Sequence, residues 1–137
     1  MIERLNPPGL HETPGYHHVT VVSAGRLAFF AGQCPLDESG TVVGPGDHLT
    51  QTDQVVANAL TVLVAAGARP DQVIRSTIYV VSDDNKVLAA VWRRLNDSDL
   101  GPAFSTASTL LGVASLGFTG QLVELDLTAA LDQTTMP

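Results

Sequence analysis

A run of β-prone residues at positions 73–81 constrains the fold more than any other feature of the chain. Branched and aromatic side chains fill its second half, and Arg75, Ser76 and Thr77 give its first half two different faces. Such a pattern is typical of a strand inside a sheet. The chain therefore folds around a sheet, and the segments on either side of this strand decide the fold class.

A helix is predicted before this strand, over residues 50–66. Thr50 is the expected N-cap, with Asp53 as the acidic residue of the first turn. Apolar residues recur there at spacings of three and four, which places them on one buried stripe. Gly67 is the expected C-terminal stop, and Pro70 prevents the helix from continuing.

A second helix is predicted after the strand, capped by Asp83 or Asp84 and ending near residue 95. Arg93 and Arg94 lie in its last turn, where positive charge suits the helix dipole. The remaining strands are predicted at residues 18–22, 27–31, 105–113 and 122–131.

The predicted order is β-β-α-β-α-β-β, which indicates an α+β fold with a mixed sheet and both helices on one face. Residues 18–22 and 27–31 are expected to pair as antiparallel strands through a turn at 23–25. The face of the sheet away from the helices is expected to be apolar and to need a cover. A homo-oligomer is the simplest cover.

The length of 137 residues indicates a single domain over 1–137. Its expected parts are an irregular arm (1–15), a core (16–131) and a flexible tail (132–137). With 14 acidic and 7 basic side chains, the formal charge of −7 argues against a nucleic-acid partner. No apolar run is long enough to span a membrane, no secretory signal is recognisable, and the lone Cys34 favours a reducing cytoplasm.

Common site motifs are absent from the sequence. There is no phosphate-binding glycine loop with a lysine, no C-x-x-C and no H-E-x-x-H. His17 and His18 would point to opposite faces of a strand, so they are not expected to bind one metal. Cys34 is interpreted as a small buried hydrophobe more readily than as a nucleophile. No metal site is therefore expected.

Several segments, in order over roughly residues 14–130, resemble the Rid family of reactive intermediate or imine deaminases, also called the YjgF-type family. The segments that carry the resemblance are Pro14-Gly15-Tyr16, Phe30-Ala31-Gly32-Gln33-Cys34-Pro35, the polar residues Gln51, Gln54 and Asn58 followed by Ala65-Ala66-Gly67, the strand at 73–80, and Leu122-Val123-Glu124-Leu125-Asp126.

The resemblance implies a chorismate-mutase-like α+β protomer that forms a homotrimer, with small-molecule ligands bound in three clefts between subunits. It implies hydrolysis of reactive enamines or imines to a ketone or keto acid plus ammonia, without a cofactor. In the active subgroup, an arginine holds the carboxylate of the substrate, because its planar fork matches that group.

Carried onto this sequence, the resemblance makes Glu124 the group that handles the attacking water, with a solvated strand glutamate as the alternative. Tyr16 would line the pocket, or pack at a subunit interface. Gly32 would allow close approach at a strand end. Gln33 would be either a ligand contact or a turn anchor.

One departure limits what the resemblance implies. The position of the arginine falls on Phe104 or, in the preferred alignment, on Ser108, and no Lys or Arg occurs from residue 95 to 137. A substitute cation would have to come from Arg26, Arg75 or a neighbouring subunit. The asparagine that often faces the site from the second helix is replaced by Ala89 or Ala90.

The leading hypothesis is therefore hydrolytic deamination of a small imine-like metabolite without a carboxylate, with Glu124 as catalytic residue and Tyr16, Gly32, Gln33, Phe104 and Ser108 around the substrate. The alternative is a non-catalytic trimer that binds a small metabolite. A third function, ribonuclease activity, is disfavoured by the acidic charge balance.

Overall fold

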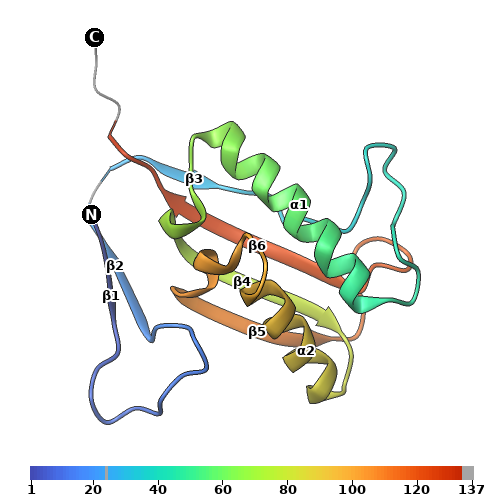
Figure 1. The fold of residues 1–137 in the computed structure, drawn as a ribbon, viewed down its shortest axis with the longest axis horizontal. Helices are drawn as coiled ribbons and strands as arrows, with labels where there is room; N and C mark the ends of the chain where they lie inside the picture. Colours follow the sequence, from blue (N-terminus) through green and yellow to red (C-terminus); the bar gives the residue numbers. More distant parts are fainter. Residues whose placement is uncertain (24, 134–137) are drawn as a thin grey trace.

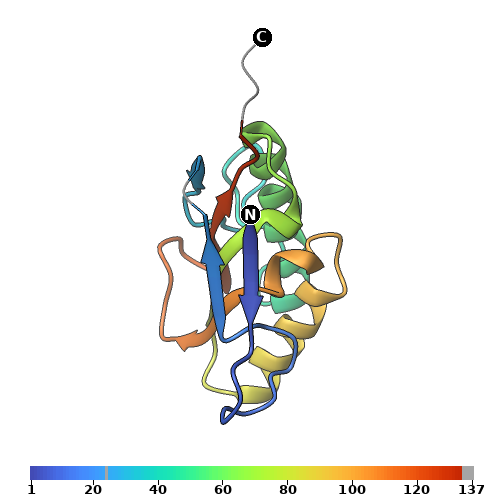
Figure 2. The ribbon, with the colours of Figure 1, turned by 90° about the vertical axis from the view of Figure 1, so that its left-hand side faces the viewer.

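Both helices lie on one face of a four-stranded mixed sheet, as Figures 1 and 2 show in two views. This computed structural model describes residues 1–23 and 25–133. The elements in chain order are β1 (Ile2–Leu5), β2 (Val19–Val22), β3 (Leu27–Phe29), α1 (His48–Ala66), the 3₁₀ helix η1 (Pro70–Gln72), β4 (Val73–Val81), α2 (Asn85–Asn96), the 3₁₀ helix η2 (Gly101–Phe104), β5 (Ala107–Val113) and β6 (Val123–Ala130).

The strand order of the main sheet is β3-β6-β4-β5. Strands β4 and β5 are parallel and are joined through α2, whereas β6 is antiparallel to both of its neighbours. The segment at 73–81 is indeed an inner strand, and the predicted mixed sheet with two helices on one face is confirmed.

Alternation along the strands sorts the side chains between the two faces of the sheet. Ile78 and Val80 on β4, and Leu125 on β6, are fully buried under the helices. Their neighbours in sequence, such as Tyr79 and Glu124, point to the opposite face, where these two residues stand directly across from each other. The core is thus the layer between the sheet and the helices.

The face away from the helices is mixed in character, where the sequence predicted an apolar face. Phe29 is 76% exposed on it and Leu111 is 41% exposed. Polar residues stand beside them, and Arg75 donates a hydrogen bond from Nη2 to Thr109 Oγ1 at 2.8 Å. The apolar face that the sequence predicted is therefore present only in part, because in a two-layer fold only the face under the helices has to be apolar throughout.

The N-terminal strands differ from the prediction. β2 pairs with β1, which lies inside the arm expected to be irregular, and β3 pairs with β6. The hydroxyl of Thr20 contacts the Thr106 hydroxyl at 2.6 Å and accepts from Ala107 N at 3.0 Å, so the β1–β2 ribbon is fixed at the start of β5. β1 has only four residues, too few for its alternation to be recognised.

The cap of α1 also differs from the prediction. Asp47, and not Thr50, is the N-cap: Oδ1 of Asp47 accepts from the backbone N–H groups of Leu49 and Thr50, both at 3.1 Å. Asp53 instead pairs with Arg94 across the two helices. The predicted caps at Gly67, with φ of 76°, and Asp84 are confirmed.

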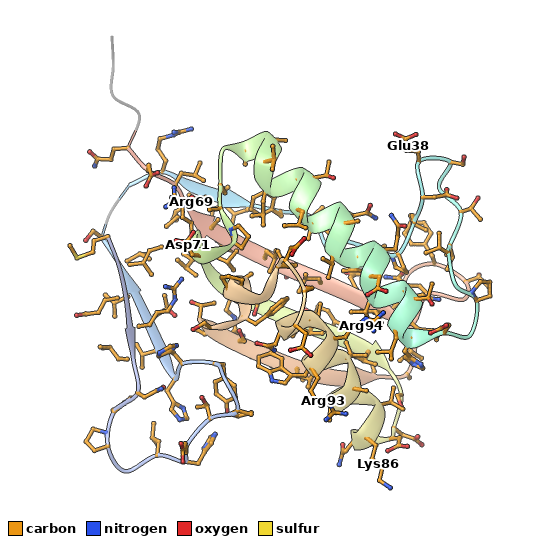
Figure 3. All side chains as sticks on the ribbon, viewed as in Figure 1. Glu38, Arg69, Asp71, Lys86, Arg93 and Arg94 are labelled. Carbon is orange, nitrogen blue, oxygen red and sulfur yellow. The ribbon has the colours of Figure 1, made fainter. Side chains whose placement is uncertain are left out.

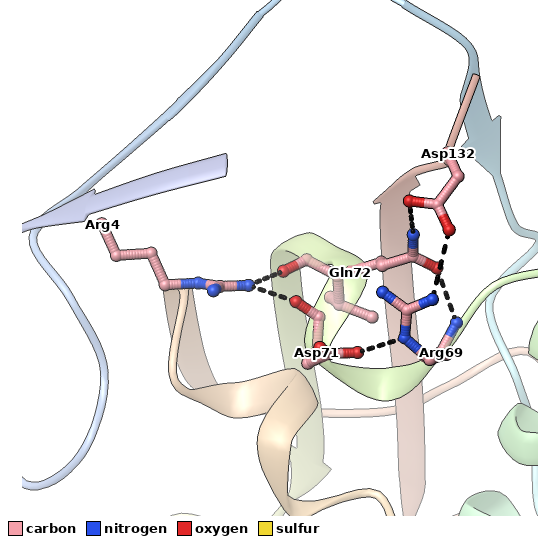
Figure 4. A network of polar contacts seen from close by, with 6 residues as sticks. Arg4, Arg69, Asp71, Gln72 and Asp132 are labelled. Atoms are coloured by element: carbon pink, nitrogen blue, oxygen red, sulfur yellow. Dashed lines mark hydrogen bonds and ion pairs between the residues drawn. The ribbon is translucent and has the colours of Figure 1, made fainter. Parts of the chain in front are cut away.

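A polar network holds the end of β6 against η1 (Figure 4). Asp132 accepts hydrogen bonds from Gln72 Nε2 at 3.0 Å and from Arg69 Nη1 at 3.2 Å. Arg4 Nη2 donates to the backbone carbonyls of Asp71 and Val73 from the side of β1. The tail predicted to be flexible therefore begins with a bonded residue, and positions 134–137 lie outside the described residues.

Among the described residues, no helix has the length and hydrophobicity required to cross a membrane.

Candidate functional site

Glu124 lies on the face of the sheet away from the helices, because its neighbours Val123 and Leu125 face the core. Its Oε1 atom accepts one hydrogen bond from Gln121 Nε2 at 3.0 Å and one from Cys34 Sγ at 3.4 Å. The carboxylate is thus held from two segments that are far apart in the sequence. We call Glu124, Gln121, Cys34 and Gly32 the Glu124 cluster.

A glycine is required at position 32 because a neighbouring side chain leaves no room for a Cβ atom, and not because of the backbone conformation. Its φ is not positive, but a Cβ built on it would lie 2.9 Å from Cδ of Glu124 and closer still to Oε2. The glutamate side chain therefore occupies the volume that any larger residue would take. This gives the close approach predicted for Gly32 a specific partner, the proposed catalytic carboxylate.

Gln33 and its backbone connect this loop to β6. Gln33 N donates to Leu125 O at 2.7 Å, and Leu125 N donates back to Gln33 O at 3.0 Å. The side-chain amide of Gln33 donates to Ala31 O at 2.9 Å. Of the two roles considered for Gln33, these contacts fit a turn anchor.

Cys34 is half-buried, and its thiol donates toward Glu124 Oε1. Burial, together with the hydrogen bond and the negative charge of Glu124, raises the pKa of the Cys34 thiol from 9.0 to about 11. The thiol therefore keeps its proton at neutral pH, which makes it a hydrogen-bond donor and a poor nucleophile. The interpretation of Cys34 as a plain buried hydrophobe missed this contact.

Polar residues in the first half and the middle of α1 hold loops in place. Asn58 Nδ2 donates to the carbonyls of Cys34 and Leu36, each at 2.9 Å. Gln51 is fully buried, and its amide donates to the carbonyls of Gly44 and Gly120. These residues therefore position the loops beside the Glu124 cluster; Gln51 is buried, whereas Asn58 is partly exposed.

A cavity of about 430 Å³ opens beside the Glu124 cluster. Its lining residues are Gly32, Gln33, Cys34, Leu36, Asp37, Glu38, Asn58 and Phe118.

A larger cavity of about 650 Å³, here called the α2 cavity, lies between α2, β5 and the loop before β2. Its lining residues are Pro14, Tyr16, Asn85, Leu88, Ala89, Trp92, Arg93, Asn96, Asp97, Ser108 and Leu110. The α2 residues among them recur at spacings of three and four, so they form one face of the helix. Two predicted site residues, Tyr16 and Ser108, line this cavity.

Aromatic rings form one wall of the α2 cavity. Trp92 contacts Tyr16 edge-to-face at 6.3 Å and Phe104 at 6.0 Å between ring centroids. The indole N–H of Trp92 donates to Pro14 O at 3.2 Å, and the Tyr16 hydroxyl bonds to His11 Nε2 at 2.6 Å. Phe104 is fully buried beneath Trp92, so it is a core residue and not part of the cavity lining predicted for it.

Ser108 uses its hydroxyl inside the protein. Its Oγ bonds to Ser76 Oγ and lies 3.2 Å from the carbonyl oxygens of Phe104 and Thr106. It therefore shapes the wall of the cavity more than it offers a free donor.

Arg93 supplies a cation that the sequence analysis did not place at the site. It lines the α2 cavity, and no hydrogen bond or ion pair from its guanidinium occurs among the described residues. The adjacent Arg94 is paired with Asp53 at 2.7 Å (Figure 3 labels both arginines). Asp97 stands on the same rim, and Ala89 occupies the middle of this helix face.

The two groups of site residues lie on opposite faces of the sheet within one chain. Glu124 is on the open face, whereas Ser108 pairs in register with Ser76, whose side chain is buried under the helices. The structure therefore brings Glu124 close to Gly32 and Cys34, and it brings Tyr16 close to Ser108. Within one chain, these two groups of residues remain apart. Among the described residues, no group of three histidine, cysteine or acidic side chains is arranged to hold a metal.

Comparison with known proteins places this arrangement in a family. The family model described as Endoribonuclease L-PSP matches residues 11–131. The chain belongs to this family, which includes the Rid, YjgF-type and RutC proteins. The RutC family protein slr0709 of Synechocystis sp. is 31% identical over 112 residues, which are 80% of this chain and 82% of that protein.

Solved structures of the family share the fold. The Rid-family protein YyfB of Yersinia pestis, described as of unknown function, superposes with a TM-score of 0.83 at 32% identity, covering 95% of this chain and 98% of that one. The predicted family and its chorismate-mutase-like α+β fold are thereby confirmed.

Protein DfrA of Myxococcus xanthus is 35% identical over 65 residues, so this chain spans about half the length of the first curated relatives it matches.

Proposed function

We propose that this Rid-family protein hydrolyses small reactive imines or enamines to a carbonyl compound and ammonia. The observation that carries the proposal is the Glu124 carboxylate, which is held by Gln121 and Cys34 beside a cavity. A carboxylate so placed can act as a general base toward a water molecule.

In the proposed reaction, the oxygen of the water bonds to the imine carbon while Glu124 takes a proton from that water. The electron pair of the C=N bond moves to the nitrogen, which takes up a proton. The resulting carbinolamine then loses ammonia as its hydroxyl becomes the carbonyl group. Glu124 moves the protons between oxygen and nitrogen, so the cycle leaves the carboxylate unchanged.

We further propose that the active form is a homotrimer whose small-molecule sites lie between subunits. The separation of the Glu124 cluster from the α2 cavity supports this, because one chain places them on opposite faces of its sheet. Apolar residues such as Phe29 and Leu111 on the open face would gain cover in such an assembly. Sedimentation equilibrium is expected to give three times the chain mass of 14.4 kDa.

The proposed substrate is an imine without a carboxylate, because residues 95–137 contain no Lys or Arg. Arg93 lines the α2 cavity, and an arginine can bind a carboxylate. The rates of hydrolysis of imines with and without a carboxylate should therefore be compared in the same assay.

The test generates imines in place with an amine or amino-acid oxidase and follows ammonia release. We expect acceleration over buffer by the wild type, loss in Glu124→Gln, and retention in Asp126→Asn, a matched charge change on the same face of β6. Thermal stabilisation by a ligand without ammonia release would instead support a binding protein. Cleavage of RNA would support the activity that the family's description names, against the charge of −7.

A further inference from the structure

The two oxygens of the Glu124 carboxylate have different surroundings. Oε1 accepts the hydrogen bonds from Gln121 and Cys34. Oε2 has no hydrogen bond among the described residues and lies against Gly32, which lines the smaller cavity. One oxygen is therefore held by two donors, and the other lies against Gly32 without a hydrogen bond among the described residues.

The position of the Cys34 sulfur is set by the backbone on both sides of it. Gln33 makes two backbone hydrogen bonds with Leu125 of β6, and the Cys34 carbonyl accepts from Asn58 of α1. The thiol is thus delivered to Glu124 by a loop anchored to both layers of the fold. Gln121, which is 3% exposed, approaches the same oxygen from the segment just before β6.

The thiol has two acceptors within reach. Glu124 Oε1 lies 3.4 Å from Sγ and the carbonyl oxygen of Gly32 lies 3.6 Å away. A hydrogen bond to an ionised acceptor is about twice as strong as one to a neutral acceptor, so the carboxylate is the preferred partner. Because the pKa of the thiol is raised to about 11, the proton for this bond is present throughout the neutral range.

We infer that Cys34 is a positioning residue that fixes Oε1 of Glu124 and so leaves Oε2 as the oxygen that takes the proton from water. This inference rests on the proposed hydrolysis for its chemical consequence. With two donors on Oε1, the carboxylate cannot rotate without losing both hydrogen bonds. Oε2 therefore stays at one place against Gly32, and a general base has to be held in place in this way.

Kinetics of two Cys34 variants test the role. Cys34→Ala removes the donor, and Cys34→Ser keeps a donor of smaller radius. We expect kcat for imine hydrolysis to fall roughly tenfold in Cys34→Ala with little change in KM, because a hydrogen bond to a charged group is lost. Cys34→Ser is expected to recover most of this loss. Equal losses in both variants, or full activity in Cys34→Ala, would overturn the inference.

A second measurement tests the contact without any turnover. Cys34 is the only cysteine of the chain, so iodoacetamide alkylation followed against pH reports on this thiol alone. We expect a midpoint near 11 in the wild type, a lower midpoint in Glu124→Gln, and no change in Asp126→Asn. An unchanged midpoint in Glu124→Gln overturns the inference. Absence of ammonia release by the wild type, with the midpoint shifted as expected, overturns the proposed function instead.

Discussion

Replacing Gly32 by alanine should displace the Glu124 carboxylate. The added methyl group would lie 2.9 Å from Cδ and 3.2 Å from Cγ of Glu124, and closer to Oε2. Real Cβ atoms do not approach other atoms so closely, and the loop at Gly32 is held to β6 by backbone hydrogen bonds of Gln33. The side chain of Glu124 therefore has to move, because the backbone is the stiffer of the two.

The displacement gives up the hydrogen bonds that Glu124 accepts from Gln121 and Cys34. Each is worth about 1.5–3 kcal/mol as a bond to a charged group, but water can replace part of this at a half-buried carboxylate. We therefore expect a net loss of stability of roughly 1–2 kcal/mol, or a fall in Tm of about 3–8 °C. Imine hydrolysis should fall as far as it does in Glu124→Gln.

The assay is differential scanning calorimetry together with ammonia release from oxidase-generated imines. Gly117→Ala is the matched control, because a Cβ at Gly117 meets no atom within 4 Å and its φ is not positive. A Gly32→Ala protein with unchanged Tm and full activity would refute the reasoning, since the carboxylate would then tolerate the methyl group.

Further predictions concern the core, the α2 cavity and the surface. Phe104→Ala should cost about 3–5 kcal/mol in urea unfolding, because Phe104 is fully buried. Arg93→Met should weaken binding of carboxylate-bearing ligands more than of neutral ones, whereas Lys86→Met should not; fluorescence of the single tryptophan, which lines the cavity, measures both. The hydrogen bond from Arg94 lowers the pKa of Asp53, so the stability that this pair adds is present above about pH 3.9 and is lost as the pH falls. Urea unfolding of Asp53→Asn should therefore show a small deficit at pH 7, because both side chains are half-exposed, and the deficit should narrow as the pH falls below about 3.9 toward the lowered pKa of Asp53.

The elements that were predicted correctly are those whose sequence pattern lies within the element itself. The strand at 73–81, the helix stop at Gly67 and the cap at Asp84 depend on residues next to each other in the chain. Strand partners do not: β2 and β3 were expected to pair because they are neighbours, yet they belong to different sheets. A strand can pair with the edge of any strand that the fold brings beside it, however distant in sequence. β2 pairs with the short strand β1 and not with its neighbour β3.

The candidate site divides in the same way. Resemblance supplied Glu124, Gly32 and Tyr16 as single positions, but the donors to Glu124 come from a loop some 90 residues earlier, at Cys34, and from Gln121. No periodicity in the sequence links these positions. The residues of the α2 cavity did carry a signal, because positions 85, 89, 92, 93 and 96 share one helical face.

That signal was missed for a physical reason. A cation in the last turn of a helix is already explained by the helix dipole. The sequence analysis therefore gave Arg93 and Arg94 this same role and did not consider Arg93 as a residue of a site. Helical geometry separates them by about 100° around the axis, which lets one reach Asp53 on α1 while the other borders a cavity.

The placement of charge across the sheet bears directly on how such a site can work. The proposed base, Glu124, stands on one face, and Arg93 with the aromatic wall stands beyond the other. A substrate small enough to be a reactive imine cannot bridge a sheet, so one chain cannot present both to it. If hydrolysis uses both, then the second set must come from another copy. Glu124 points to the open face, which the proposed trimer would cover with another copy.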